Sequence, residues 1–360
     1  MEDQKFEKIF YEMARPEERG LEAYDAGPMP PARVRISANE NNIGVSPKAR
    51  AAMADELAMG NRYPESSCTE LREKIAKKHG LSPDQIIVGN GLDGVFTMLG
   101  RTFLNHGDEV VCGELTFSVY SDTALVMGAK PVVVPMTERM ELDTDGYIKA
   151  FGAKTKMICF CNPNNPTGNV AGIKQIRRML DAVPEKALFI LDEAYMEFVD
   201  DPQPTGISLL KEYPNLMVCR TFSKIFGLAG LRVGWAAAQP GLISYMYKVR
   251  EPYCVNTIAE AGALAALDDS EFVERSRALV REERARLCGF FADKGIKFLP
   301  SQVNFILVSF GDRTEYVCRA LADDGILTRM LPFRGEKLLR ISIGLPEENT
   351  IVMDSLKKVI

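Results

Sequence analysis

Histidine is scarce in this sequence of 360 residues, which contains only His79 and His106. His79 precedes Gly80 at a predicted helix end, where a positive charge suits the helix dipole. His106 lies in a turn of the sequence Asn-His-Gly. We interpret both as structural residues, so zinc sites and histidine-based catalytic triads are poorly supported.

Paired cysteines are missing as well. The eight cysteines are scattered, none forms a Cys-x-x-Cys pair, and Cys112, Cys159 and Cys219 lie in apolar runs that are typical of strands. This pattern predicts reduced core residues rather than a metal site or a disulfide framework.

Long apolar runs and basic stretches are also absent. No run approaches the length of a membrane-spanning helix, and the first residues are charged and lack the apolar core of a signal peptide. The net charge is −5 and no basic stripe is visible, which disfavours nucleic-acid binding. We therefore expect a cytoplasmic protein that binds neither membranes nor nucleic acids.

The stretch 215–234, NLMVCRTFSKIFGLAGLRVG, contains the strongest indication of chemistry. An apolar run typical of a buried strand leads into Thr221, Ser223 and Lys224, and Arg232 follows in a Gly-rich segment. A lysine after a strand is more often a solvated surface charge. Here hydroxyl groups and a guanidinium suited to phosphate accompany it. This combination favours a phosphorylated carbonyl cofactor held as a Schiff base, as pyridoxal 5′-phosphate is.

Such a cofactor needs partners, and the sequence supplies them after separate predicted strands. Asp192 follows the apolar run 187–191, where a carboxylate needs a cation such as a pyridinium, and Tyr195 comes three residues later. Asn165 lies in the Pro-rich turn after the predicted strand 156–161. Phe117 follows another strand and either stacks on a ring or packs in the core. Glycines at 89, 91 and 94 separate a strand from a helix, which suits either an anion site or an ordinary turn.

The order of predicted elements indicates an α/β fold. Strands alternate with helices from about 86 to 235, which predicts a large domain with a mostly parallel central sheet flanked by helices. We expect an N-terminal arm at 1–40 that partly joins the small domain, the large domain at 41–245, and a smaller α+β domain at 246–360. Within the last part we predict a long helix at 270–294 and strands at 303–309 and 338–343. Arg340 lies within the last of these strands, where it needs either a fixed glutamate or, as we favour, a substrate carboxylate.

These residues resemble the pyridoxal-phosphate aminotransferases of the aspartate aminotransferase fold over nearly the whole chain. Within that group the sequence is most similar to the histidinol-phosphate aminotransferase family. The matching stretches are NENNIGVSPKA (39–49), RYP (62–64), GNGLDG (89–94), PNNPTG (163–168), DEAYMEF (192–198), RTFSKIFGLAGLRVG (220–234), EPYCVNTIA (251–259) and RISIG (340–344).

The resemblance implies roles around the cofactor ring. Lys224 would bind the cofactor covalently and move the proton during the reaction. Asp192 would hold the pyridine nitrogen, Tyr195 and Asn165 the ring oxygen, and Phe117 would stack on the ring. The cofactor phosphate would be held by the amides of Asp93 and Gly94 and by Thr221, Ser223, Arg232 and, from the other subunit of a homodimer, Tyr63.

The resemblance also implies a substrate. Arg340, beside Asn165, would bind the α-carboxylate, while Arg329 and Tyr24, the latter from across the dimer interface, would hold a substrate phosphate. This favours L-histidinol phosphate and 2-oxoglutarate as substrates. An aromatic aminotransferase and a threonine-phosphate decarboxylase remain alternative enzymes. A pyridoxal-phosphate-binding regulator is a third alternative, although the first 36 residues are too short and acidic for a DNA-binding helix-turn-helix.

Overall fold

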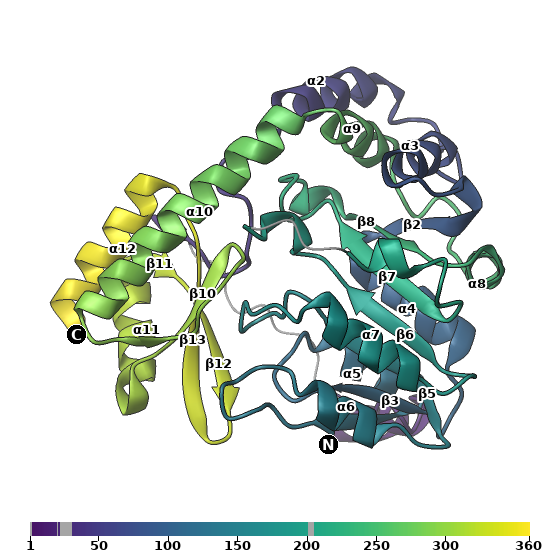
Figure 1. Cartoon of the computed structure of the whole chain (residues 1–360), viewed down its shortest axis with the longest axis horizontal. Coiled ribbons are helices and arrows are strands. Elements are labelled where there is room, and N and C mark those ends of the chain that lie inside the picture. The colour runs from purple at the N-terminus through teal and green to yellow at the C-terminus, as the bar shows by residue number, and fades with distance from the viewer. Residues whose placement is uncertain (1, 20, 22–30, 201–204) are drawn as a thin grey trace.

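The computed structural model describes residues 2–19, 21, 31–200 and 205–360. Its larger sheet has seven strands in the order β2-β8-β7-β6-β5-β3-β4 (Figure 1). These strands are β2 (Ile86–Asn90), β8 (Val233–Ala237), β7 (Leu216–Thr221), β6 (Leu188–Asp192), β5 (Thr155–Cys161), β3 (Glu109–Gly113) and β4 (Lys130–Val134). β8 is antiparallel to both of its neighbours, and the other pairs are parallel. The predicted mostly parallel sheet is confirmed.

Helices cover both faces of this sheet, so its central strands are buried on both sides and need continuous apolar sequence. Strand β6 shows the result, because all of its residues are buried. In Figure 1, α6 (Thr144–Ala150) and α7 (Ile173–Ala182) lie in front of the sheet, while α4 (Gly91–Phe103) and α5 (Val119–Val126) lie behind it. Further helices of this part are α2 (Pro47–Glu56), α3 (Thr69–His79), α8 (Pro240–Tyr247) and α9 (Thr257–Leu267).

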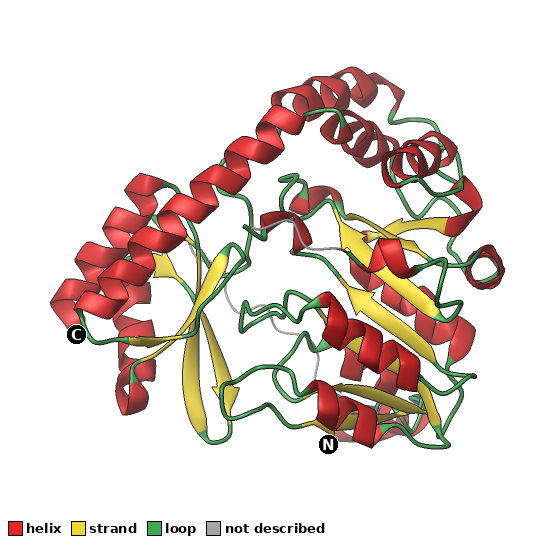
Figure 2. Cartoon of the chain, in the orientation of Figure 1, coloured by secondary structure: helices red, strands yellow, loops and turns green. Residues whose placement is uncertain are grey.

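A second, antiparallel sheet has four strands in the order β12-β13-β10-β9 (Figure 2). The strands are β12 (Arg329–Phe333), β13 (Glu336–Ser342), β10 (Phe305–Ser309) and β9 (Lys297–Phe298), accompanied by α10 (Ser270–Asp293), α11 (Thr314–Asp323) and α12 (Pro346–Val359). The predicted helix 270–294 is confirmed as α10. The side chain of Asp269 caps its start by accepting from the amide of Phe272. The predicted strand 303–309 begins two residues later, at Phe305.

Two more strands pair residues that are far apart in the chain. β1 (Val34–Arg35) is parallel to β11 (Ile326–Leu327). The remaining elements are α1 (Glu2–Met13) and the short 3-10 helices η1 (Leu57–Met59), η2 (Pro83–Gln85), η3 (Met196–Phe198), η4 (Gly206–Leu209), η5 (Ala229–Leu231) and η6 (Gly311–Arg313). α9 packs against α2 and α3, and α10 extends from this group of helices to the four-stranded sheet (Figure 1). The division into domains at 40 and 245 stays a prediction.

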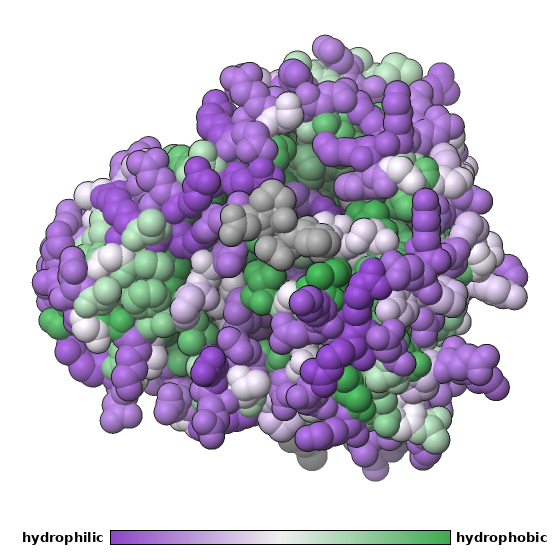
Figure 3. All heavy atoms as spheres, viewed as in Figure 1, coloured by the Kyte–Doolittle hydropathy of each residue, from purple (hydrophilic) through white to green (hydrophobic). Residues whose placement is uncertain are grey.

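The scarce residue types are structural in character. Burial lowers the pKa of His79 to about 4, and its ring lies 5.2 Å from that of Trp235. His79 is therefore neutral at pH 7, and the expected interaction of its charge with the helix dipole is wrong. All eight cysteines are free. In the described ranges, no helix is long and apolar enough to cross a membrane, and hydrophilic residues cover most of the face shown in Figure 3.

Candidate active site

The site forms where neighbouring parallel strands end. The carboxyl ends of β5, β6 and β7 lie at one edge of the sheet, because the three strands are parallel and adjacent. The residues that follow or end these strands therefore come together: Asn165, Asp192, Thr221, Ser223 and Lys224. Ligands of open α/β sheets bind at this edge.

Lys224 is half-buried at this edge and carries an amine of unusually low basicity. Its Nζ donates to the carbonyl of Ala38 at 3.2 Å and lies 5.5 Å from the centre of the Tyr195 ring. Burial, together with the nearby cations Arg340 and Arg232, lowers the pKa of Lys224 to about 8. A larger share of the amine is thus neutral at physiological pH than for an ordinary lysine, which suits a nucleophile or a base.

Asp192 is a buried carboxylate, only 2% exposed, at the last position of β6. It accepts hydrogen bonds from the hydroxyl of Tyr120 at 2.7 Å and from the amide of Ala194 at 3.0 Å. Burial raises its pKa to about 6. No ion pair to it is found among the described residues. A buried acceptor of this kind fits a protonated pyridine nitrogen, which would compensate its charge.

Two polar side chains expected at the cofactor ring lie close to Lys224 and Arg340. Tyr195 is buried, its hydroxyl accepts from Nδ2 of Asn39 at 3.0 Å, and burial raises its pKa above the usual range. Asn165 is half-buried, and its Oδ1 accepts from Nη1 of Arg340 at 2.6 Å. The hydrogen bond from Arg340 spans the space between the two sheets.

A cradle of donors lies at the start of α4, which begins at Gly91, within the glycine-rich stretch that was expected to precede the helix. Asp93 and Gly94 are therefore in its first turn, where free amide groups favour an anion. Arg232 reaches the same place: its Nη2 donates to Asp93 at 3.0 Å and its Nη1 to Oγ of Ser223 at 3.3 Å. A pocket of about 290 Å³ is lined by Asp93, Gly94 and Arg232, among others. Its donors fit a phosphate group.

The approach of Arg232 requires glycine at position 91. Gly91 has φ +71°, and a Cβ there would lie 2.4 Å from Nη2 of Arg232. Thr221 supports the cradle indirectly. Its Oγ1 accepts from the amide of Ser223 at 3.0 Å, which helps to fix the position of Ser223. The cradle therefore depends on backbone and side chains from three separate segments.

Two aromatic residues line the approach to Asp192. Phe117 is half-buried and meets Tyr120 edge to face, with ring centres 5.8 Å apart. This placement leaves Phe117 available to stack on a ring whose nitrogen points to Asp192. Tyr120 was missed by sequence reasoning. The only indication was its position three residues after Phe117, which would place both on one face of a helix.

Arg329 and Arg340 lie directly opposite each other on the antiparallel strands β12 and β13. Arg340 also donates to the carbonyl of Ser37 at 2.6 Å. Two guanidinium groups at opposite positions provide charged donors from both strands, which suits an anion. The structure thus brings together the two arginines that the sequence nominated.

Two site residues were predicted to act from the partner subunit, Tyr63 and Tyr24. Tyr63 is 82% exposed and stacks on Tyr253, with ring centres 4.7 Å apart. Tyr24 lies outside the described residues.

A buried ion pair was also missed. Arg220 donates to Glu193 at 2.7 Å and to Glu197 at 2.8 Å, next to Asp192 and Thr221. It holds the ends of β6 and β7 together.

A family model, curated relatives and solved structures were compared with this chain, and they agree with one another. The family model for aminotransferase class I and II matches residues 33–356. The histidinol-phosphate aminotransferase of Anaeromyxobacter sp. is 40% identical over 329 residues, which cover 91% of this chain and 90% of that protein. The crystal structure of histidinol-phosphate aminotransferase from Sinorhizobium meliloti in complex with pyridoxal-5′-phosphate has a TM-score of 0.88 and 28% identity, and covers 96% of both chains. L-threonine-O-3-phosphate decarboxylase from Porphyromonas gingivalis, at 22% identity and a TM-score of 0.78, covers 90% of this chain and 98% of its own, and shares the fold.

Proposed function

The chain belongs to the aminotransferase class I and II family, and we propose that it transfers the amino group of L-histidinol phosphate to 2-oxoglutarate. The products are imidazole acetol phosphate and L-glutamate, and the reaction belongs to histidine biosynthesis. The cofactor is pyridoxal 5′-phosphate, which fits both the buried Asp192 and the cradle around Arg232. The relatives named above support this choice of substrate.

Each side chain near the cofactor has a role that its chemistry supports. When bound, pyridoxal phosphate supplies an electron sink for the substrate carbon that bears the amino group. Asp192 keeps a proton on the ring nitrogen, because its buried carboxylate needs a cation. Lys224, whose pKa of about 8 allows a neutral amine, takes up the proton from the substrate carbon and returns it. Tyr195 and Asn165 would hold the ring oxygen, and Phe117 would stack on the ring.

The observation that carries the substrate assignment is the pair of arginines on β12 and β13. Arg329 and Arg340 lie directly opposite each other, and the hydrogen bond from Arg340 to Asn165 places this pair beside the cofactor site. A phosphate dianion or a carboxylate between two guanidinium groups gains charge-assisted hydrogen bonds from both. We propose that the phosphate of histidinol phosphate and the carboxylates of glutamate occupy this place in alternate half-reactions.

The test is a single half-reaction followed by absorbance. Purified holoenzyme is mixed with L-histidinol phosphate, and the cofactor band is followed as the aldehyde form converts to the amine form. L-phenylalanine, L-glutamate and L-threonine phosphate are measured in parallel. We expect fast conversion with histidinol phosphate and glutamate. Conversion with phenylalanine but not histidinol phosphate would identify an aromatic aminotransferase, and release of carbon dioxide from threonine phosphate would identify a decarboxylase.

A variant makes the assay specific for the arginine pair. Arg329→Ala is expected to raise KM for histidinol phosphate by at least about tenfold, because it removes charged hydrogen bonds to the phosphate. Arg319→Ala is the matched control, since Arg319 is an exposed arginine that pairs with Glu315 on α11. Unchanged KM in the Arg329 variant would argue against phosphate binding at this place.

We also propose a homodimer in which Tyr63 and Tyr24 contact the active site of the partner. The exposure of Tyr63 and Tyr253 supports this proposal, since a stacked aromatic pair at the surface is typical of an interface. Sedimentation would give the mass of the assembly. Mixing an inactive Lys224→Ala chain with an inactive Tyr63→Ala chain should restore activity if the two residues serve one site from different chains. A cytoplasmic location remains a prediction, supported by the eight free cysteines.

A further inference from the structure

The strand that carries Arg329 has a single strand neighbour. β12 is an edge strand, so its backbone pairs with β13 alone. That pairing places Arg329 opposite Arg340. The position of β12 therefore depends on contacts elsewhere in the β12–β13 hairpin.

The tip of this hairpin is built for a contact with the other sheet. The turn between the strands consists of Arg334 and Gly335, with φ values of 47° and 82°. Positive φ at both positions is typical of tight hairpin turns. Arginine is a strained choice there, because residues with a branched or long side chain rarely adopt it. A contact of the Arg334 side chain would compensate this strain.

Arg334 makes such a contact across the space between the two sheets. Its Nε and Nη2 donate to the carboxylate of Glu114, at 2.9 and 2.6 Å, and Nη2 also donates to the carbonyl of Met136 at 3.3 Å. Glu114 directly follows β3 and accepts from the amide of Met136, which lies beyond the end of β4. The hydrogen bond from Arg334 lowers the pKa of Glu114, so the carboxylate is ionised at neutral pH.

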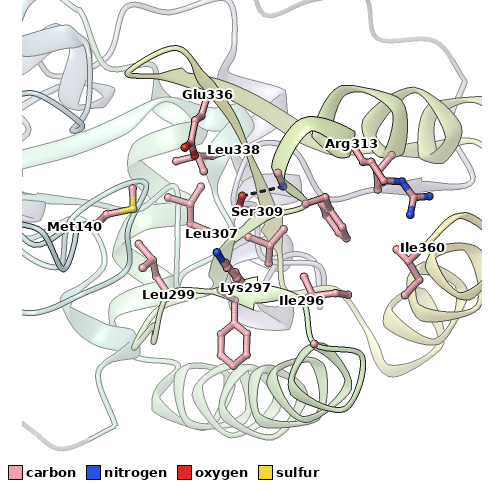
Figure 4. A pocket seen from close by; sticks show the side chains of 16 residues that line it. Met140, Ile296, Lys297, Leu299, Leu307, Ser309, Arg313, Glu336, Leu338 and Ile360 are labelled. Carbon is pink, nitrogen blue, oxygen red and sulfur yellow. Dashed lines mark hydrogen bonds between the residues drawn. The ribbon is translucent and has the colours of Figure 1, made fainter.

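The four-stranded sheet also carries a cavity of about 580 Å³ (Figure 4). Leu307 and Leu338 line it from the sheet, and Met140 lines it from the segment that follows β4. Neither Arg334 nor Glu114 lines this cavity, so their ion pair is a separate polar contact between the hairpin and the segment that follows β3.

We infer that Arg334 and Glu114 form a latch, a bidentate ion pair that sets the position of the β12–β13 hairpin relative to the seven-stranded sheet. The latch thereby positions Arg329 and Arg340 to bind anionic substrates. Glu114 also lies three residues before Phe117, which we place at the cofactor ring. The inference rests on the proposed function, since it assigns substrate anions to the two arginines. Arg334 and Glu114 touch neither substrate nor cofactor and are positioning residues.

The test uses three variants and one matched control. Glu114→Gln and Arg334→Gln each break the latch, and the double variant Glu114→Arg, Arg334→Glu restores it with reversed charges. Arg177→Gln is the control, because Arg177 forms an equally bidentate, exposed ion pair with Glu212, at 2.6 and 2.8 Å, on the outside of the seven-stranded sheet. We would measure KM and kcat for histidinol phosphate and for glutamate, and the affinity for pyridoxal phosphate.

Each single latch variant should raise KM for both anionic substrates by about two- to fivefold, the range expected from a partly exposed ion pair. kcat and cofactor affinity should stay within about twofold of wild type, the charge-reversed double variant should recover most of the KM, and Arg177→Gln should change nothing. Hydrogen exchange of the amides at 329–333 should also be faster in the single variants, with exchange at 155–161 unchanged.

Arg329→Ala, measured in parallel, distinguishes a failure of the latch inference from a failure of the proposed function. If that variant raises KM but the latch variants do not, the latch inference is overturned and the proposed function stands. If neither raises KM, the latch inference and the binding of the substrate phosphate by Arg329 are both overturned, and the half-reaction with histidinol phosphate decides separately on the proposed reaction. Equal loss of cofactor affinity and substrate affinity in the latch variants would also overturn the inference, since it would indicate general disruption.

Discussion

The buried carboxylate of Asp192 gives a prediction about the protein without its cofactor. Burial raises the pKa of this group from an ordinary 3.8 to about 6. This rise of about two in the pKa corresponds to about 3 kcal/mol, by which the ionised carboxylate destabilises the folded state at pH 8. The cofactor-free enzyme is therefore less stable than the same fold with a neutral group at position 192.

Asp192→Asn removes the charge and keeps the size of the side chain, but it leaves one acceptor oxygen in place of the two that accept from Tyr120 and Ala194, so the expected gain in stability is an upper limit. We expect the free energy of unfolding of the cofactor-free variant to exceed that of wild type by up to about 3 kcal/mol at pH 8, or about 4 °C in Tm for a chain of this length. Between pH 3.8 and about 6 the folded state of wild type binds more protons than the unfolded state. The free energy of unfolding of wild type therefore falls as the pH rises through this range. The difference in free energy of unfolding between the variant and wild type should thus be about half as large at pH 5 as at pH 8.

The assay is unfolding of both proteins at pH 5, 6.5 and 8 and at one protein concentration, with and without saturating pyridoxal phosphate. The cofactor should stabilise wild type more than the variant, because it supplies the cation that the carboxylate needs. Asp354→Asn is the control, since Asp354 is exposed and pairs with Lys357. A cofactor-free variant that is less stable than wild type at pH 8, or a gap that does not change with pH, would refute the reasoning.

Three further predictions concern single side chains. Tyr120→Phe removes the hydrogen bond to Asp192 and should weaken pyridoxal-phosphate binding by about tenfold in an absorbance titration, whereas Tyr147→Phe, which loses a bond to the carbonyl of Cys159, should leave that affinity unchanged. The rate at which cofactor-free enzyme takes up the cofactor should rise with pH around a midpoint of about 8, because burial and nearby cations lower the pKa of Lys224 and its neutral amine is the reactive form; a midpoint near that of a free lysine would contradict this. Glu193→Ala leaves the buried Arg220 with Glu197 as its carboxylate partner and should cost about 1.5–3 kcal/mol in chemical unfolding, while Glu212→Ala, at an exposed pair, should cost less than about 1 kcal/mol.

Much of the fold was predictable because the relevant information is local. Alternation of apolar runs with helical periodicity indicated the mostly parallel sheet, and a capping aspartate marks the start of α10. One rule of topology then brought Lys224, Asp192 and Asn165 together, since adjacent parallel strands end at the same edge. The antiparallel insertion of β8 between β2 and β7 was not predictable, because strand order depends on pairing between distant segments.

The sequence by itself determined the residue types of the site and the segments that carry them, because a buried strand followed by a polar residue is visible locally. Only the tertiary structure decided which side chains act on one another. Tyr120 donates to Asp192 across 72 residues, Asn39 to Tyr195 across 156, and Arg334 to Glu114 across 220. The low pKa of Lys224 likewise depends on burial and on two arginines, of which Arg340 comes from a distant part of the chain. Burial, hydrogen bonds and charge interactions all depend on distances in space, and spacing along the chain does not give those distances.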